Sequence, residues 1–218
     1  ENKAGWARYS SLSSLPESEV ATMARIIGIT GGIASGKSTV TEFLRQQGYQ
    51  VIDADQVVHE LQEPGGRLYQ ALLSTFGSAI LQEDGHLDRP KLGAMIFGNP
   101  DLLAQSSQLQ NEIIREELAR RRDLLAETET IFFMDLPLLF ELEYDNWFDQ
   151  IWLVDVTEET QLSRLMNRNA LNQEEAERIA AQLSLQEKRK RADVLIENNG
   201  NLEATLAQVD QLLKTERR

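Results

Sequence analysis

Short apolar runs recur along the chain and predict the strands of one sheet. Five of them are separated by segments with helical spacing, and they cover residues 26–29, 50–52, 131–136, 151–156 and 194–196. Continuous apolar runs are typical of strands that are buried on both faces, as in a parallel sheet covered by helices. The alternation predicts an α/β fold with a parallel five-stranded sheet in a three-layer α/β/α core.

Between the second and third runs, from about residue 57 to residue 128, the apolar spacing is largely helical. Turn and capping residues divide this region into several helices, with breaks at Pro64-Gly65-Gly66, Glu83-Asp84-Gly85 and Asn99-Pro100-Asp101. The region is therefore predicted to be a helical insertion between strands of the core. His59 and His86 occur in it singly, and surface or turn roles are expected for both.

Two helices are predicted after the fourth run, over residues 157–168 and 172–191, and a third closes the chain after residue 200. Arg164 and Arg168 lie one turn apart on one helix face. Phosphate contact is favoured for this pair, because guanidinium groups match phosphate geometry. The basic run 188–191 is interpreted as a solvated helix face.

The first apolar run leads into a glycine-rich motif. Gly31, Gly36, Lys37 and Ser38 satisfy G-x-x-x-x-G-K-[ST], directly between a predicted strand and a predicted helix. In such a P-loop the backbone N–H groups surround phosphate, the lysine reaches the β and γ phosphates, and the Ser38 hydroxyl ligates Mg²⁺. The predicted nucleotide-binding residues here are Gly31, Gly32, Ile33, Ala34, Ser35, Gly36, Lys37, Ser38 and Thr39.

Acidic residues stand at the ends of the other predicted strands. Asp53 and Asp55 follow the second run at a spacing that puts two strand side chains on one face. Each is interpreted either as a proton acceptor or water-mediated Mg²⁺ ligand, or as the cap of a helix starting at Gln56. Asp135 is a second candidate for Mg²⁺, and Asp155 is assigned equally to a structural or a functional role.

Composition narrows the classes of partner. The 218 residues carry a formal net charge of −13, which argues against nucleic acid, and no apolar run approaches the length of a membrane span. The absence of cysteine suits the cytoplasm. Residues 1–22 are polar and serine-rich, and they are interpreted as a leader added for expression before a native start at Met23, or as a disordered extension.

Several segments together resemble dephospho-CoA kinase, a P-loop family of the nucleoside-monophosphate-kinase-like group. They run in family order from Met23 to the C-terminus and comprise residues 29–40, Val51-Ile52-Asp53-Ala54-Asp55, Asp84-Gly85-His86-Leu87-Asp88-Arg89, Ile96-Phe97-Gly98-Asn99-Pro100, Asp135-Leu136-Pro137-Leu138-Leu139-Phe140-Glu141 and residues 192–200. The P-loop fits many ATPases, whereas the Asp-Ala-Asp, Pro-Leu-Leu and final Ala-Asp-x-x-Ile-x-Asn segments are more selective.

The resemblance implies transfer of the γ-phosphoryl group of ATP, with Mg²⁺, to the ribose 3′-hydroxyl of dephospho-CoA, yielding CoA and ADP. It implies a nucleotide-binding core (23–56, 129–157 and 192–218), an acceptor domain (57–128) and a lid (158–191). A monomer that binds neither nucleic acid nor membrane is expected.

The resemblance also implies the roles of single residues. Asp55 matches the general base, Lys37 and Ser38 match the phosphate and Mg²⁺ groups, and Arg164 matches a lid arginine. The remaining implied contacts are with the acceptor (Asp53, Arg89, Pro137, Leu138, Leu139) and near adenine (Asn199, Gly200).

One position departs from the family pattern, because Asn111-Glu112 stands about where many relatives have His-Pro. The contribution of that histidine is therefore absent here or supplied otherwise. Two rival functions are a kinase for a nucleoside monophosphate or a sugar-like alcohol, and a P-loop regulatory ATPase. No Asn-Lys-x-Asp guanine-reading motif occurs in the sequence to favour the latter.

Overall fold

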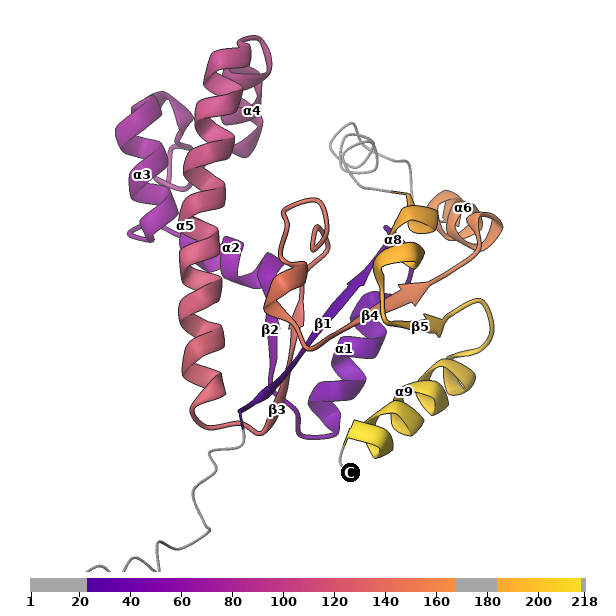
Figure 1. Ribbon diagram of the computed structural model, residues 1–218. Coiled ribbons are helices and arrows are strands. Elements are labelled where there is room, and N and C mark those ends of the chain that lie inside the picture. Colours follow the sequence, from indigo (N-terminus) through magenta and orange to yellow (C-terminus); the bar gives the residue numbers. More distant parts are fainter. Residues whose placement is uncertain (1–22, 168–183, 217–218) are drawn as a thin grey trace, which may run out of the picture.

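The core of the molecule is a parallel five-stranded sheet (Figure 1). The computed structural model describes residues 23–167 and 184–216, so the predictions for residues 1–22, for Arg168 and for a helix over 172–183 lie outside the described residues. The strands are β1 (Arg25–Gly31), β2 (Val51–Asp53), β3 (Ile131–Asp135), β4 (Gln150–Asp155) and β5 (Val194–Glu197), in the order β2-β3-β1-β4-β5. Every neighbouring pair is parallel, which confirms the predicted sheet.

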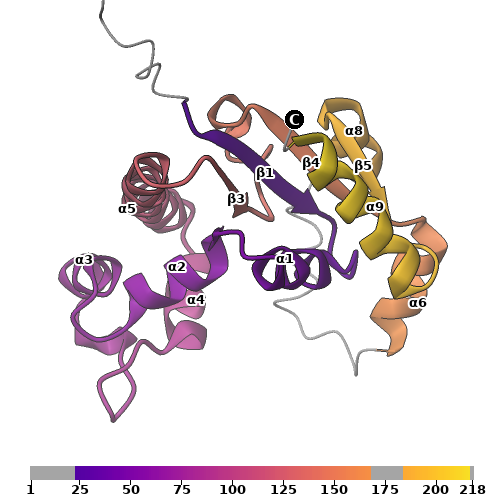
Figure 2. The ribbon, with the colours of Figure 1, turned by 90° about the horizontal axis from the view of Figure 1, so that it is seen from below.

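Helices cover both faces of this sheet. Because strand side chains alternate, Phe133 of β3 packs with α1 (Lys37–Gln46) and α9 (Leu202–Glu216), whereas Phe132 and Met134 face the opposite way. Figure 2 shows α1 beside α9, with α5 away from both on the far side of β3. The carboxyl ends of the parallel strands meet at one edge, where ligands bind in such sheets.

The helical insertion lies between β2 and β3. It consists of α2 (Ala54–Gln62), α3 (Arg67–Phe76), η1 (Ser78–Ile80), α4 (Arg89–Phe97) and α5 (Pro100–Ala126). The Asn99 side chain accepts from the backbone N–H groups of Asp101 and Leu102, which confirms the predicted start of the long helix. After β3 follow η2 (Asp145–Trp147), α6 (Glu158–Asn167) and α8 (Leu185–Arg191).

Two helix boundaries differ from the prediction. The helix expected to begin at Gln56 begins at Ala54, and the side chain of Asp53 caps it by accepting from the N–H of Gln56 at 3.1 Å. The helix predicted over 172–191 is interrupted at Ser184, whose backbone is not helical and whose side chain caps α8 by accepting from the N–H of Glu187. In both cases a short polar side chain satisfies a free N–H group of the first turn and sets the boundary.

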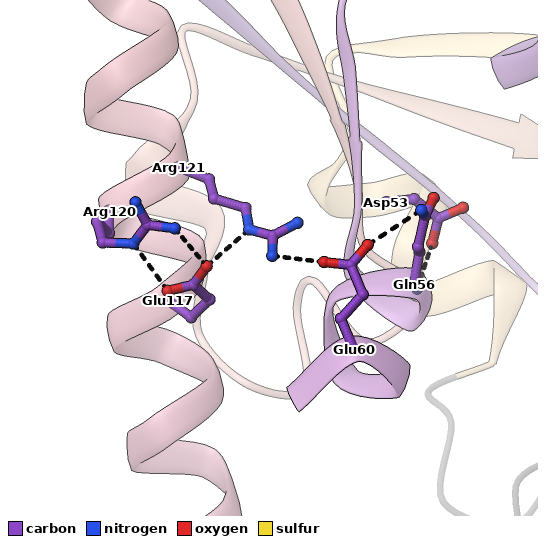
Figure 3. A network of polar contacts seen from close by, with 6 residues as sticks. All are labelled: Asp53, Gln56, Glu60, Glu117, Arg120 and Arg121. Atoms are coloured by element: carbon purple, nitrogen blue, oxygen red, sulfur yellow. Dashed lines mark hydrogen bonds and ion pairs between the residues drawn. The ribbon is translucent and has the colours of Figure 1, made fainter. Parts of the chain in front are cut away.

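A network of ionic hydrogen bonds joins α5 to α2, the helix that leads out of the carboxyl edge of the sheet (Figure 3). Glu117 is buried and accepts both Nε and Nη2 of Arg120 at 2.8 and 2.7 Å, and also Nε of Arg121 at 2.8 Å. The other end of the Arg121 guanidinium donates to Glu60 of α2 at 2.6 Å. The hydrogen bond from Arg120, together with that from Arg121, lowers the pKa of Glu117 to about 2.

The low pKa of Glu117 makes its contribution to stability dependent on pH. We expect Glu117→Gln to reduce the free energy of unfolding by about 1.5–3 kcal/mol at pH 7. Because the folded pKa lies below the ordinary value, the stabilisation is complete above about pH 4.5 and is lost as pH falls toward about 2. Urea unfolding of both proteins between pH 7 and pH 3 measures this difference.

The control is Glu116→Gln, one residue earlier on the same helix. The Glu116 side chain is 55% exposed and pairs with Arg67 on the surface, so its loss should cost less than about 1 kcal/mol. Equal losses in the free energy of unfolding for the two variants would contradict the stabilising role of ionised Glu117. A loss in Glu117→Gln that stays the same in acid would also contradict it.

Candidate active site

The glycine-rich loop turns sharply between β1 and α1. Gly36 precedes the helix with φ +85°, a left-handed conformation, and Ala34 also has a positive φ of 58°. A Cβ atom on Gly36 would collide with the side-chain nitrogen of Asn198. The loop is therefore shaped by a residue without a side chain, and the strained Ala34 marks a position where surrounding contacts fix the backbone.

The backbone carbonyl groups of this loop accept hydrogen bonds from side chains of distant segments. Gln161 of α6 donates to the Ile33 carbonyl at 2.8 Å, and Asn198, directly after β5, donates to the Ser35 carbonyl at 2.7 Å. Arg164 donates to the carbonyls of Ala34 and Ser35, both at 3.3 Å, and to that of Asn198 at 2.7 Å. Side-chain donors therefore satisfy three successive carbonyls of the loop.

Lys37 lies at the start of α1 and forms an ion pair with Asp135, at the end of β3. The Asp135 side chain is 4% exposed, and that of Lys37 is 17% exposed. Burial raises the pKa of Asp135, although the Lys37 ammonium opposes this shift, while the carboxylates of Asp53 and Asp55 add to it. The sheet edge thus gathers one amine and three acidic side chains, as the strand-end positions predicted.

The two aspartates after the second predicted strand differ in their surroundings. Asp53 is the last residue of β2 and caps α2, and Arg45 Nη2 lies 3.6 Å from its second carboxylate oxygen. Asp55 lies in the first turn of α2 and is exposed. They therefore do not both lie on the strand, as the spacing had suggested, and the capping role belongs to Asp53.

A cavity of about 470 Å³ opens beside the loop. It is lined by Ala34, Gly36, Thr39, Arg164, Asn198, Gly200 and Leu202. The structure thus brings Arg164 and Gly200, two residues to which the resemblance gives a role, together with three residues of the P-loop. The side chain of Asn199 instead accepts from the N–H of Thr157, just before α6.

Sequence reasoning gave no role to Asn198, the last residue of the Ala-Asp-x-x-Ile-x-Asn segment, which lies against Gly36 and is held by the Thr205 hydroxyl at 2.8 Å. Its place directly after the apolar run of β5 was the available signal, because the carboxyl ends of parallel strands form the ligand edge.

The residues expected near the acceptor fall into two places. Pro137 and Leu138 follow β3 and are partly exposed, whereas Leu139 is completely buried and packs near Gly28. Arg89 begins α4 and lines a different cavity, of about 280 Å³, with both histidines and Glu63. The structure does not place Arg89 in the cavity beside the P-loop.

The interpretation of residues 188–191 as a solvated helix face was wrong for Lys188 and Arg189, whereas Lys190 and Arg191 are exposed. Lys188 is completely buried, and Arg189 donates to Asp155 at 2.7 Å and to the Val156 carbonyl at 2.9 Å. The Arg191 guanidinium lies 4.5 Å from the centre of the Phe140 ring and pairs with Asp145. The pattern was misleading because the acidic and aromatic partners come from distant segments.

The site is suited to phosphate and Mg²⁺. The Ser35 hydroxyl is buried inside the loop and has no hydrogen-bond partner within residues 23–167 and 184–216. Ser38 is exposed in the first turn of α1, on the same edge as Asp135. No group of three or more His, Cys, Asp or Glu side chains in the described residues could hold a metal by itself.

Comparison with known proteins decides the family. A family model described as dephospho-CoA kinase matches residues 25–204. The chain belongs to the dephospho-CoA kinase family. Curated relatives with that name include those of Streptococcus mutans, 63% identical over 88% of this chain and 98% of the relative, and Streptococcus pneumoniae, 58% identical over 88% and 96%. The resemblance stated from the sequence is confirmed.

Solved structures agree with this family assignment. A crystal structure of a Thermus thermophilus protein is 32% identical and covers 88% of this chain and 98% of its own, with a TM-score of 0.73. Dephospho-CoA kinase from Campylobacter jejuni is 25% identical, covers 89% and 100%, and has a TM-score of 0.66. The predicted P-loop kinase fold, with its helical insertion, is therefore the fold of this family.

Gly36 offers a direct test of the phosphate-binding loop. We expect Gly36→Ala to weaken ATP binding about tenfold or more, because the new methyl group displaces Asn198 and the loop amides. Isothermal titration with MgATP measures the affinity.

Gly48→Ala is the matched control. Gly48 has nearly the same backbone angle, φ +87°, but no atom lies within 4 Å of the position that an alanine methyl group would take there. The variant should lose about 1–2 kcal/mol of stability from the left-handed conformation and keep its affinity for ATP. The same ATP affinity in both variants would contradict the role given to Gly36.

Proposed function

We propose that this protein phosphorylates the ribose 3′-hydroxyl of dephospho-CoA with ATP, giving CoA and ADP. The observation that supports this most strongly is the joint placement of Lys37, Asp135 and Asp55 at the carboxyl edge of the sheet, directly beside the P-loop. Family membership favours this acceptor over a nucleoside monophosphate or another alcohol, because the close relatives are named dephospho-CoA kinases.

The chain's own groups supply alignment and charge. The backbone amides of the loop and of the first turn of α1 hold the β and γ phosphates, and Lys37 exchanges Asp135 for phosphate oxygen. Ser38 is the expected protein ligand of Mg²⁺, with Asp135 or Asp55 contacting it through water. Mg²⁺, when bound, neutralises developing charge on the β and γ oxygens.

In the reaction itself, the acceptor 3′-oxygen forms a bond to the γ-phosphorus while the bond from that phosphorus to the β–γ bridging oxygen breaks. The proton of the hydroxyl passes to the carboxylate of Asp55, which is exposed at the edge and therefore accessible. Asp53, held as the cap of α2, positions the first turn that contains Asp55.

The proposal assigns the rest of the site as follows. Residues 57–128 receive the CoA precursor, with Arg89 and the turn at Pro137–Leu139 on its border. The cavity lined by Arg164 and Gly200 receives the adenosine end of ATP, with Asn199 next to it. Residues 158–191 form the lid, from which Arg164 contacts phosphate and Arg168 is proposed to assist.

Location and assembly complete the proposal: a monomer that acts in the cytoplasm. No helix within residues 23–167 and 184–216 is long and apolar enough to cross a membrane. The net charge of −13 opposes binding to nucleic acid and to anionic membrane surfaces. Light scattering after size exclusion tests the monomer.

The test of the reaction measures ADP release by the purified protein with MgATP, with dephospho-CoA, AMP, adenosine or no acceptor. We expect ADP with dephospho-CoA alone, with CoA as co-product, and no product with EDTA or in the Lys37→Ala variant. Equal ADP release without an acceptor, or release with another acceptor only, would overturn the proposed function.

Asp55 has a test of its own. We expect Asp55→Ala to lower kcat by about 10²-fold or more, because the hydroxyl loses its proton acceptor, while ATP affinity changes little. Steady-state kinetics and MgATP titration measure the two quantities. Unchanged turnover would remove Asp55 from this role.

A further inference from the structure

Lys188 is a buried charged residue to which the reaction above gives no role. It lies in α8, and its side chain is completely inaccessible to solvent. Its ammonium group donates to the Pro137 carbonyl at 2.9 Å and lies 3.0 Å from Oε1 of Glu141. Burying an ammonium group is costly unless its partners are well placed, so these contacts define where the group must lie.

The Pro137 carbonyl also accepts from the hydroxyl of Thr30, at 3.3 Å. Thr30 is completely buried and directly precedes Gly31, the first glycine of the P-loop. Proline has no N–H group, so its carbonyl is the one backbone group through which this residue can be hydrogen-bonded. One oxygen atom thus connects the end of β1, the turn after β3, and α8.

Helix α8 has docking contacts besides those of the Lys188 ammonium group. Arg189 fixes the helix to Asp155 and the Val156 carbonyl, and Arg191 fixes it to Asp145 and Phe140. An apolar side chain of similar length would fill the same space without the cost of a buried charge. The presence of an ammonium group on Lys188 is therefore explained by its hydrogen bond to the turn at Pro137 rather than by the packing of α8.

We propose that Lys188 is a positioning residue, which orients the Pro137–Leu138 turn against the P-loop and so aligns the acceptor hydroxyl with the γ-phosphate. This inference rests on the proposed function, in which the turn borders the acceptor. Lys188 itself is buried beneath the turn and does not touch the substrate.

The experiment compares Lys188→Met with Lys190→Met in steady-state assays with MgATP and dephospho-CoA. Lys190 lies on the same helix, but its side chain is 61% exposed and pairs with Glu187, within the helix. We expect Lys188→Met to lower kcat/KM for dephospho-CoA about tenfold or more, because misplaced groups lose catalytic alignment. The KM for ATP should stay within about twofold of wild type, and Lys190→Met should match wild type in both.

A second variant separates the positioning role of Lys188 from the effect of removing the positive charge beside the Glu141 carboxylate. Lys188→Met/Glu141→Gln removes the charge of that carboxylate as well, so its melting temperature should recover toward wild type while the loss in kcat/KM for dephospho-CoA remains. Recovery of kcat/KM together with stability would overturn the proposal. An unchanged kcat/KM for dephospho-CoA in either variant would also overturn it. The same is true of a loss of kcat/KM that is equal for ATP and for dephospho-CoA.

Thr30→Val tests the shared oxygen. If Thr30 and Lys188 act through the Pro137 carbonyl, the loss in kcat/KM of the double variant is smaller than the product of the two single losses. Independent, multiplicative losses would overturn the proposed route. If the wild-type protein does not phosphorylate dephospho-CoA, the proposed function is wrong. If the wild-type protein is active and Lys188→Met has the same kcat/KM, only the inference about Lys188 is wrong.

Discussion

The phosphate-binding loop depends on the satisfaction of its carbonyl groups. A loop that turns successive N–H groups toward an anion turns other polar groups away from it, and buried carbonyls need donors. Here Gln161, Arg164 and Asn198 supply those donors to residues 33–35. The end of β5 and the helix after β4 are thus part of the loop's construction, although they lie far from it in sequence.

The same dependence explains how one arginine can serve two purposes. Arg164 contributes to the cavity beside the loop and at the same time donates to the carbonyls of Ala34, Ser35 and Asn198. A guanidinium group has five N–H donors in a rigid plane, so it can hold backbone carbonyls on one side and leave a face toward the cavity. A lysine at this position lacks that geometry.

The acidic character of the carboxyl edge of the sheet comes from aspartate residues at and just after the strand ends. Asp53 and Asp135 are paired in register on β2 and β3, and Asp55 follows in the first turn of α2. Burial disfavours charge on Asp135 and raises its pKa, while Lys37 provides the compensating charge from α1. The amine of the P-loop is therefore held against a carboxylate, in a chain whose overall charge is strongly negative.

Local patterns predicted the strands, the P-loop and the Asn99 cap because each is decided within a few neighbouring residues. They did not predict the burial of Lys188 or the partners of Arg164, because these arise between segments 34 to 130 residues apart. The Asp53 cap was one of two open interpretations, and the contact with Gln56 selects between them. Tertiary contacts thus overrode the helix-face interpretation at Lys188 and Arg189, while several short segments together, and not the P-loop alone, were sufficient for the family.

The length of helix α5 has a mechanical consequence for the helical insertion. Its 27 residues give a rod of about 40 Å, with contacts to β2 and β3 near one end and the α4 connection at the other (Figure 1). A tilt of about 10° at the sheet would displace the far tip by about 7 Å. A small rotation of α5 at the sheet is therefore amplified at its far end, and the hydrogen bond from Arg121 to Glu60 holds α5 against α2 close to the sheet.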